Sequence, residues 1–581
     1  MLSVEDFFAI IFWKGKIMSQ WKSYKPIWPE TVVFWGAGAT RALNMHTTDE
    51  LGQAIYNLAQ EKSLAERVNS IFGLAEISEC IADLLLILGD DERPAVEFPS
   101  SIQQAALQRQ FYNLTAGERI RRGRELRYLY DWGTLKQLVH VCPGHCATSF
   151  RLQDLFNLLD MHIVSRHGFH VYGSQGANPR FAAPESLVLA RNALIMLIGL
   201  LHFYAYHKTL LEEHAVYQQY IGFAEILAKL MQAEGQRFFL DGHSLNDRRF
   251  YLFSYAIIHM NWDTILLWLI FNAHRKLNHA GDKLLSDNLA ASLELFHDLS
   301  YFMGIRRVDS CEPTIWYPHN ESVVQQVNDS SQSISHRVRI GKFYFPHGCS
   351  GWRECPSCGK VTMYLGNQWG YHSPSLFVPP LLPRLSEDWH QPRSIEEADA
   401  YFQGQADAVQ CAYCGTLTEL RHTPLVMQSS FKGHHPPFLE EIQRDMRISL
   451  EKAEHIVMFG YTLPSDDVIY RSLLSARQKR DKGHGPYCSV VVGRRADAPE
   501  YWLYGDELTD YLQQESVQKS DFAKAITTAR ELFGTERVRG YAGGIPQVFT
   551  ECNSGLASQE KVLDLLYPKQ CYGQPIIRDK G

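Results

Sequence analysis

The sequence predicts an α/β protein: a doubly wound parallel sheet with a large helical insertion and a small zinc-ribbon-like module. Three observations predict this class. Runs of β-branched and aromatic residues alternate with segments of helical periodicity, each run ends in a glycine or polar cluster, and two CxxC pairs interrupt the second half. The expected strands are residues 31–35, 255–260, 339–345, 455–459 and 488–492. Such sheets bind ligands at the carboxyl ends of their strands, where these clusters lie.

The bulk properties are those of a globular protein of several lobes. A chain of 581 residues is too long to fold around a single hydrophobic core, so we expect more than one lobe. The net charge of −7 gives no general attraction to nucleic acid or anionic membranes. A basic run at residues 119–127 is interrupted by glutamates, which indicates a solvated helix face. The longest apolar run, residues 193–205, is too short to cross a bilayer, and residues 1–16 lack signal-peptide features. We expect a cytoplasmic protein without a membrane segment or direct nucleic-acid binding.

The pattern along the chain predicts a discontinuous nucleotide-binding domain. The sheet segments are separated by a long stretch of helical composition and by a Cys-, Pro- and Gly-rich stretch. The expected parts are an N-terminal extension (1–30), a Rossmann-like domain (31–60, 250–350 and 422–500), a helical insertion (61–249), a zinc-knuckle module (351–421) and a helical C-terminal tail (501–581).

A glycine turn follows the first expected strand. Gly36-Ala37-Gly38, with Thr40 just beyond, lies between that strand and a helix. Glycines here allow a pyrophosphate to approach the backbone, and the following helix offers free amides to its charge. Any tight strand-to-helix turn explains the same residues, and Arg41 occupies the third glycine position of the full dinucleotide fingerprint. The turn alone therefore leaves both readings open.

Two further expected strands end in polar side chains. Asn261-Trp262-Asp263 places an amide and a carboxylate after one strand, where they suit a water, a ribose hydroxyl and a carboxamide; helix capping is the alternative for either residue. His347 ends the other strand, and an imidazole can take a proton from water or a ribose hydroxyl near pH 7. A lone histidine is more often structural. The assignment of His347 as a base therefore depends on the three strand ends meeting in one crevice.

The two CxxC pairs predict a metal site. Cys355, Cys358, Cys411 and Cys414 each belong to a knuckle with glycine after the second cysteine, and four thiolates suit a closed tetrahedral zinc site. Such a zinc is structural, because four sulfur ligands leave no open position; a redox dithiol is the alternative. The cluster of Cys142, His145 and Cys146 is interpreted as incidental.

In this order the motifs resemble the sirtuin superfamily. The residues that carry the resemblance are the turn at 36–38, Asn261-Trp262-Asp263, His347-Gly348, the cysteine knuckles and Gly460-Tyr461-Thr462-Leu463-Pro464. It covers residues 31–60, 255–275, 339–365 and 405–495. The resemblance implies that His347 is the base on the ribose, that Asn261 orients ribose and water, and that Asp263 holds the nicotinamide carboxamide. It also implies that Gly460, Tyr461 and Thr462 contact the nucleotide.

This chain lacks two motifs that the family's protein deacylases carry, and both absences argue against an acyl-lysine substrate. Deacylases carry a Pro-Asp-Phe-Arg stretch after the glycine turn, whereas this chain has Arg41-Ala42-Leu43-Asn44. They also carry a Phe-Gly-Glu segment after the zinc knuckles, where this chain reads 424–431, Pro-Leu-Val-Met-Gln-Ser-Ser-Phe. The long helical insertion instead resembles the bacterial antiphage-defence branch, whose members hydrolyse NAD.

The resemblance therefore implies a defence NADase, which yields nicotinamide and ADP-ribose and causes abortive infection. Such an enzyme needs restraint, so we expect activation by homo-oligomerisation or by a separate phage-sensing partner, for example a ring-forming HerA-type ATPase. Two alternatives stay open: an NAD-dependent protein deacylase, and a non-catalytic scaffold that binds NAD or ADP-ribose.

Overall fold

The structure is a computed structural model of the 581-residue chain. It describes residues 29–60, 132–142, 149–171, 180–212, 214–240, 252–279, 292–298, 303–306, 315–317, 336–349, 352–354, 361–364, 409–410, 417–418, 425–426, 437–465, 467–480, 485–493, 498–568, 570–571 and 574–575. Every structural statement below concerns these residues.

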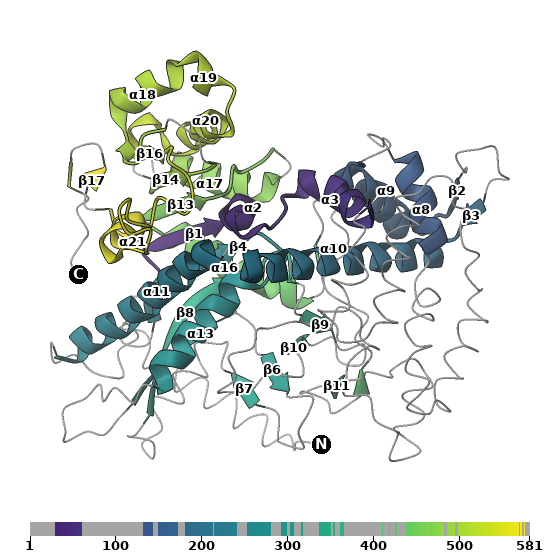
Figure 1. The fold of residues 1–581 in the computed structure, drawn as a ribbon, viewed down its shortest axis with the longest axis horizontal. Coiled ribbons are helices and arrows are strands. Elements are labelled where there is room, and N and C mark those ends of the chain that lie inside the picture. Colours follow the sequence, from purple (N-terminus) through teal and green to yellow (C-terminus); the bar gives the residue numbers. More distant parts are fainter. Residues whose placement is uncertain are drawn as a thin grey trace.

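A central eight-stranded sheet organises the described chain (Figure 1). Its order is β15-β16-β14-β13-β1-β4-β8-β5, and all neighbours are parallel except the edge pair β15–β16. The strands are β1 (Thr31–Trp35), β4 (Leu252–His259), β5 (Ser292–Asp298), β8 (His336–Tyr344), β13 (His455–Phe459), β14 (Tyr487–Val491), β15 (Trp502–Leu503) and β16 (Val538–Tyr541). The predicted α/β class with a mostly parallel sheet is confirmed.

β1 and β13 form the middle of this sheet because their sequences are apolar on both faces. Each strand is buried along its whole length, as a parallel sheet covered by helices on both sides requires. β1 pairs in register with both neighbours, so that Trp35 lies beside Phe459 on one side and His259 on the other. The ends of these three strands are therefore level with one another.

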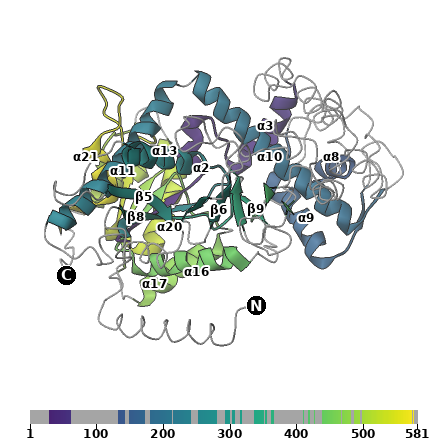
Figure 2. The ribbon, with the colours of Figure 1, turned by 90° about the horizontal axis from the view of Figure 1, so that it is seen from below.

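Helices cover the two faces of the sheet (Figure 2). One face carries α11 (His214–Leu240) and α13 (Ile265–His279), and the other carries α16 (Pro437–Lys452), α17 (Val468–Arg480) and α20 (Asp521–Phe533). The apolar side chains of α11, among them Phe223 and Ala224, belong to the same buried core as the strands. This part of the predicted insertion thus packs directly on the sheet.

The other described helices of the predicted insertion gather at one end of the molecule (Figure 1). They are α8 (Trp132–Val141), α9 (Leu152–Ser165) and α10 (Pro184–Glu212), with a hairpin of β2 (Phe169–Val171) and β3 (Arg180–Ala182) before α10. α3 (Thr48–Gln60), from the predicted Rossmann-like domain, packs against α9 and α10. No helix in the described ranges is long and apolar enough to cross a membrane.

Two smaller sheets lie in the second half of the chain. One has the order β7-β6-β10-β9 and the other is the hairpin β11–β12. Their strands are β6 (Met303–Arg306), β7 (Ile315–Tyr317), β9 (Trp352–Glu354), β10 (Val361–Tyr364), β11 (Val409–Gln410) and β12 (Leu417–Thr418). The hairpin brackets residues 411–416, but Cys355, Cys358, Cys411 and Cys414 all lie outside the described residues. The zinc module stays a prediction.

The C-terminal region corrects one expectation, because it is more than a helical tail. β15 and β16 extend the central sheet, and they alternate with α18 (Gly505–Gln513), α19 (Glu515–Gln518), α20 and α21 (Gln559–Leu566). A short hairpin, β17 (Gln570–Cys571) with β18 (Gln574–Pro575), follows. The region 501–541 is thus an integral part of the sheet.

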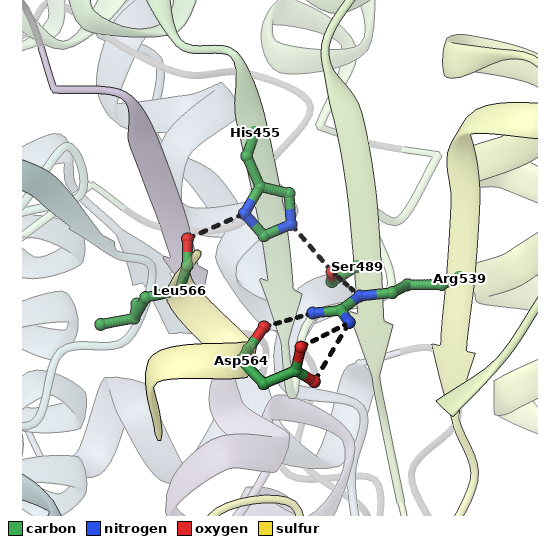
Figure 3. A network of polar contacts seen from close by, with 5 residues as sticks. All are labelled: His455, Ser489, Arg539, Asp564 and Leu566. Atoms are coloured by element: carbon green, nitrogen blue, oxygen red, sulfur yellow. Dashed lines mark hydrogen bonds and ion pairs between the residues drawn. The ribbon is translucent and has the colours of Figure 1, made fainter. Parts of the chain in front are cut away.

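A buried polar network attaches α21 to the sheet (Figure 3). Arg539 of β16 donates to Ser489 Oγ of β14 and to both the carboxylate and the carbonyl of Asp564. His455 of β13 lies within hydrogen-bond distance of the same Ser489 oxygen and of the Leu566 carbonyl. These contacts satisfy carbonyls at the end of α21 that the helix itself leaves without donors.

Candidate functional site

The strand order places a topological switch point between β1 and β13. The chain runs from β1 to β4 on one side, and from β13 to β14 on the other. In open α/β sheets the connections that diverge in this way leave a crevice beyond the carboxyl ends of the two strands, which is the usual ligand position. Here those ends carry Gly36 and Gly460.

The two glycine turns at the switch point pack directly on each other. The Gly36 amide donates to the Phe459 carbonyl and the Gly38 amide to the Gly460 carbonyl, both at 2.9 Å. A Cβ atom at Gly36 would lie 2.4 Å from the Gly460 oxygen, and one at Gly460, where φ is +63°, would lie 2.0 Å from the Ala39 nitrogen. Close turn-to-turn packing therefore explains these glycines, and the Gly38 amide is already engaged.

Thr40 links the end of β1 to the end of β4. Its side chain is buried, and its hydroxyl lies 3.5 Å from the Ala37 carbonyl at the start of α2 (Ala37–Thr40). The Asn261 side-chain amide approaches the same hydroxyl at 3.4 Å. Thr40 and Asn261, which are predicted site residues from different strand ends, are thus brought together.

Asp263 acts as a helix cap. One carboxylate oxygen accepts from the Ile265 amide at 3.2 Å at the start of α13, so the structural alternative for this residue is confirmed. The side chain is only 5% exposed, and the described part of the chain gives it no other hydrogen-bond donor. Within the described residues its second oxygen accepts no hydrogen bond, so a donor from a ligand can use it.

Two histidines, His259 and His202, lie close enough to Asp263 to feel its charge. His259 Nε2 lies 3.9 Å from an Asp263 oxygen, while His259 Nδ1 lies 3.1 Å from the Asn261 carbonyl. Burial lowers the pKa of His259, and the nearby Asp263 carboxylate only partly opposes this. Burial likewise lowers the pKa of His202 in α10 to about 4. Both rings are neutral near pH 7, and they therefore do not neutralise Asp263.

His347 is held as one defined tautomer. The residue is 3% exposed, and its Nδ1 lies 3.3 Å from the Met260 carbonyl, which can only accept. Nδ1 therefore carries the proton in the neutral ring, and Nε2 has the lone pair. That lone pair faces the Tyr470 hydroxyl of α17 at 3.4 Å. Burial raises the pKa of Tyr470, which keeps its hydroxyl protonated and able to donate.

In the Gly460-Tyr461-Thr462 turn, the first two residues make contacts within the protein, and the third is partly exposed. The Gly460 amide donates to the Val491 carbonyl at 2.7 Å, and the Tyr461 ring stacks on Phe34 with centroids 5.5 Å apart. The Tyr461 hydroxyl donates to the buried Asp467 carboxylate. Tyr461 therefore supports the turn with its side chain, whereas Thr462 stays partly exposed beside it.

Three residues that contact the candidate site were not predicted from the sequence. Tyr470 contacts His347, Tyr220 of α11 donates to the Ala39 carbonyl in the glycine turn, and Val426 donates its amide to the His347 carbonyl at 2.8 Å. Each lies far from its partner in sequence, and no motif marks it. The helix that carries Tyr470 also holds Val468, Ile469 and Leu474, so its apolar pattern does not single out Tyr470.

The described residues contain no cluster of three or more potential metal ligands. The metal prediction therefore depends entirely on the four cysteines, which those residues do not include. No protein-family model matches the chain, and no curated protein matches it.

Proposed function

We propose that the chain is an NAD⁺ hydrolase that cleaves the bond between nicotinamide and ribose. The observation that carries the proposal is the arrangement of His347 beside Met260 and Asn261 at the ends of β8 and β4, with β4 directly next to the β1–β13 switch point. It combines a base of fixed tautomer, an amide and a carboxylate at the end of a sheet where dinucleotides bind. The resemblance to sirtuin-like NADases supports the same assignment.

The dinucleotide lies over the interlocked Gly36 and Gly460 turns in this proposal, beyond the carboxyl ends of β1 and β13. Ala37 and Thr462 are partly exposed on these turns. Because the Gly38 amide already donates to Gly460, the pyrophosphate is bound by other groups, such as the Thr462 hydroxyl. NAD is the substrate in this account rather than a resident cofactor.

The proposed reaction adds water to the C1′ carbon of the nicotinamide ribose. Nicotinamide leaves with the electron pair of the C–N bond, and the sugar becomes oxocarbenium-like. Asn261 orients ribose and water, the free Asp263 oxygen accepts from the nicotinamide carboxamide, and His347 Nε2 takes the proton that water loses. Tyr470 must release Nε2 before that transfer, because its hydroxyl faces the same lone pair.

We also propose a structural zinc ion held by Cys355, Cys358, Cys411 and Cys414. Four thiolates would stabilise the fold around them without taking part in the chemistry. The serine variants of Cys355 and Cys414 are expected to lose zinc and stability together. Metal analysis of soluble, well-folded protein that finds no zinc would refute this part.

The biological role that we propose is abortive antiphage defence, with activity released by homo-oligomerisation or by a partner such as a HerA-type ATPase. An NADase that is always active would kill its host. The contact between Tyr470 and His347 agrees with a low basal rate, since it occupies the base. This role rests on the family resemblance.

The test is to incubate the purified chain with NAD, with and without candidate partners, and to quantify nicotinamide and ADP-ribose. Release of both products without peptide supports hydrolysis. Nicotinamide release only with an acylated peptide would replace the proposal by a deacylase. Tight NAD binding without turnover under every condition would leave a scaffold.

A further inference from the structure

A two-residue segment, Leu425–Val426, bridges the two polar strand ends of the candidate site. The Val426 amide donates to the His347 carbonyl at 2.8 Å, and the Val426 carbonyl accepts from the Trp262 indole at 3.2 Å. Trp262 is the central residue of Asn261-Trp262-Asp263. We call Leu425–Val426 the strap. The backbone of one residue, Val426, thus holds His347 and Trp262 in fixed relation.

The other end of the strap is held by helices of the insertion. Arg191 of α10 donates from Nη2 to the Leu425 carbonyl at 3.2 Å and from Nε to Asp160 of α9 at 3.0 Å. Phe156, one turn before Asp160, packs edge-on against the Trp262 ring with centroids 6.3 Å apart. Two neighbouring residues on α9 therefore reach the site, one directly and one through Arg191.

These contacts are buried enough to be strong. The side chains of Asp160 and Arg191 are 10% and 22% exposed, and Leu425, Val426 and Trp262 are all below 9%. A guanidinium presents several donors in a rigid fork, so it can satisfy a carboxylate and a carbonyl together. A lysine ammonium is a point charge that keeps the ion pair but cannot reproduce that fork.

We propose that Arg191 is a positioning residue that couples helices α9 and α10 to the catalytic pair through the strap. Arg191 touches no reacting group in this scheme; it fixes the strap, and the strap fixes His347 relative to Trp262 and its neighbour Asn261. The insertion thereby becomes the element through which a partner or oligomer controls the site. The effect on turnover rests on the proposed NAD hydrolysis, whereas the coupling through the strap does not.

The test compares Arg191→Lys and Arg191→Met with Arg151→Met as the control. Arg151, just before α9, forms a more exposed ion pair with Asp154 at 3.4 Å, and within the described residues its side chain is not bonded to the strap. Hydrogen exchange is followed in overlapping peptides containing Val426, together with kcat and KM for NAD. Melting temperatures verify that each variant is folded.

Both Arg191 variants should increase exchange at Val426 at least tenfold and lower kcat at least tenfold, with KM within twofold; the control should change neither. Unchanged exchange in Arg191→Lys would overturn the coupling. Faster exchange with unchanged kcat would overturn the positioning role. If the wild-type chain does not cleave NAD, the proposed function fails and the exchange result alone still decides the coupling.

Discussion

His347 Nδ1 lies 3.3 Å from the carbonyl oxygen of Met260, the residue that precedes Asn261. The contact joins the ends of β8 and β4 and fixes the histidine tautomer. It also aims the opposite ring nitrogen at Tyr470 rather than at bulk solvent. A carbonyl that orients one histidine nitrogen so that the other can act as a base is a common arrangement in catalytic sites.

The His347→Gln variant should lose at least about 100-fold in kcat for NAD cleavage, which is the usual effect of removing a general base. Glutamine has a similar volume and can still donate to the Met260 carbonyl, so the melting temperature should change little. Steady-state release of nicotinamide measures the rate. Turnover within threefold of wild type would show that His347 is not the base.

The Tyr470→Phe variant tests whether the Tyr470 hydroxyl inhibits His347 by bonding to its Nε2 or instead takes part in catalysis. Without its hydroxyl, His347 Nε2 loses one donor, worth about 1 kcal/mol for a neutral hydrogen bond. The variant should therefore cleave NAD up to about fivefold faster at subsaturating substrate. The assay is kcat/KM with and without activating partners. A large loss of kcat would instead identify Tyr470 as part of the catalytic machinery.

Gly460→Ala and Gly493→Ala form a matched pair that tests the packing of the glycine turns. Both residues have positive φ, +63° and +53°, so both variants lose about 1–2 kcal/mol from backbone strain. Only the Gly460 variant also meets Ala39 at 2.0 Å, which adds about 1–3 kcal/mol of overpacking and distorts the crevice. Chemical unfolding and NAD binding measure the difference. Equal behaviour of the two variants would contradict the interlocked turns.

Arg539→Met tests the network that attaches α21. Arg539 is 3% exposed and donates hydrogen bonds to Ser489 and Asp564. Its loss should therefore destabilise the protein by about 2–4 kcal/mol. Lys524→Met is the control, because its ion pair with Asp521 is exposed and worth at most about 1 kcal/mol. Urea denaturation compares the two. A loss in Arg539→Met no larger than in the control would refute the role of the network.

The buried His259 should make the stability of the fold depend on pH. Burial lowers its pKa below the ordinary 6.5, so below that pH the unfolded chain binds a proton that the folded chain resists. The contribution is complete above about pH 6.5 and is lost progressively on acidification. Melting temperatures between pH 7.5 and pH 5 should fall more steeply for wild type than for His259→Gln. Parallel curves would show that His259 does not contribute.

The apolar elements of the fold were predictable from sequence because their composition agrees with their position. Residues 31–35 and 455–459 form β1 and β13 with the expected bounds. β16 was missed because Val-Arg-Gly-Tyr has no strand pattern. Arg539 lies inside the sheet only because Ser489 and Asp564, distant in sequence, satisfy its donors.

The site was predictable where polar residues directly follow a strand. Thr40, Asn261 and His347 do lie at neighbouring strand ends, as their positions indicated. Tyr470 and the strap were not predictable, because the contacts that matter join segments with no shared pattern. The glycine turn also has a simpler explanation than phosphate binding, namely its contact with Gly460.

The most direct test of the central claim is the product balance when NAD is incubated with wild-type and His347→Gln protein, without peptide and in the presence of any activating partner. The account predicts nicotinamide and ADP-ribose in a 1:1 ratio, formed by the wild type and nearly abolished in the variant. Full NAD recovery with both proteins, or equal rates with both, would contradict it.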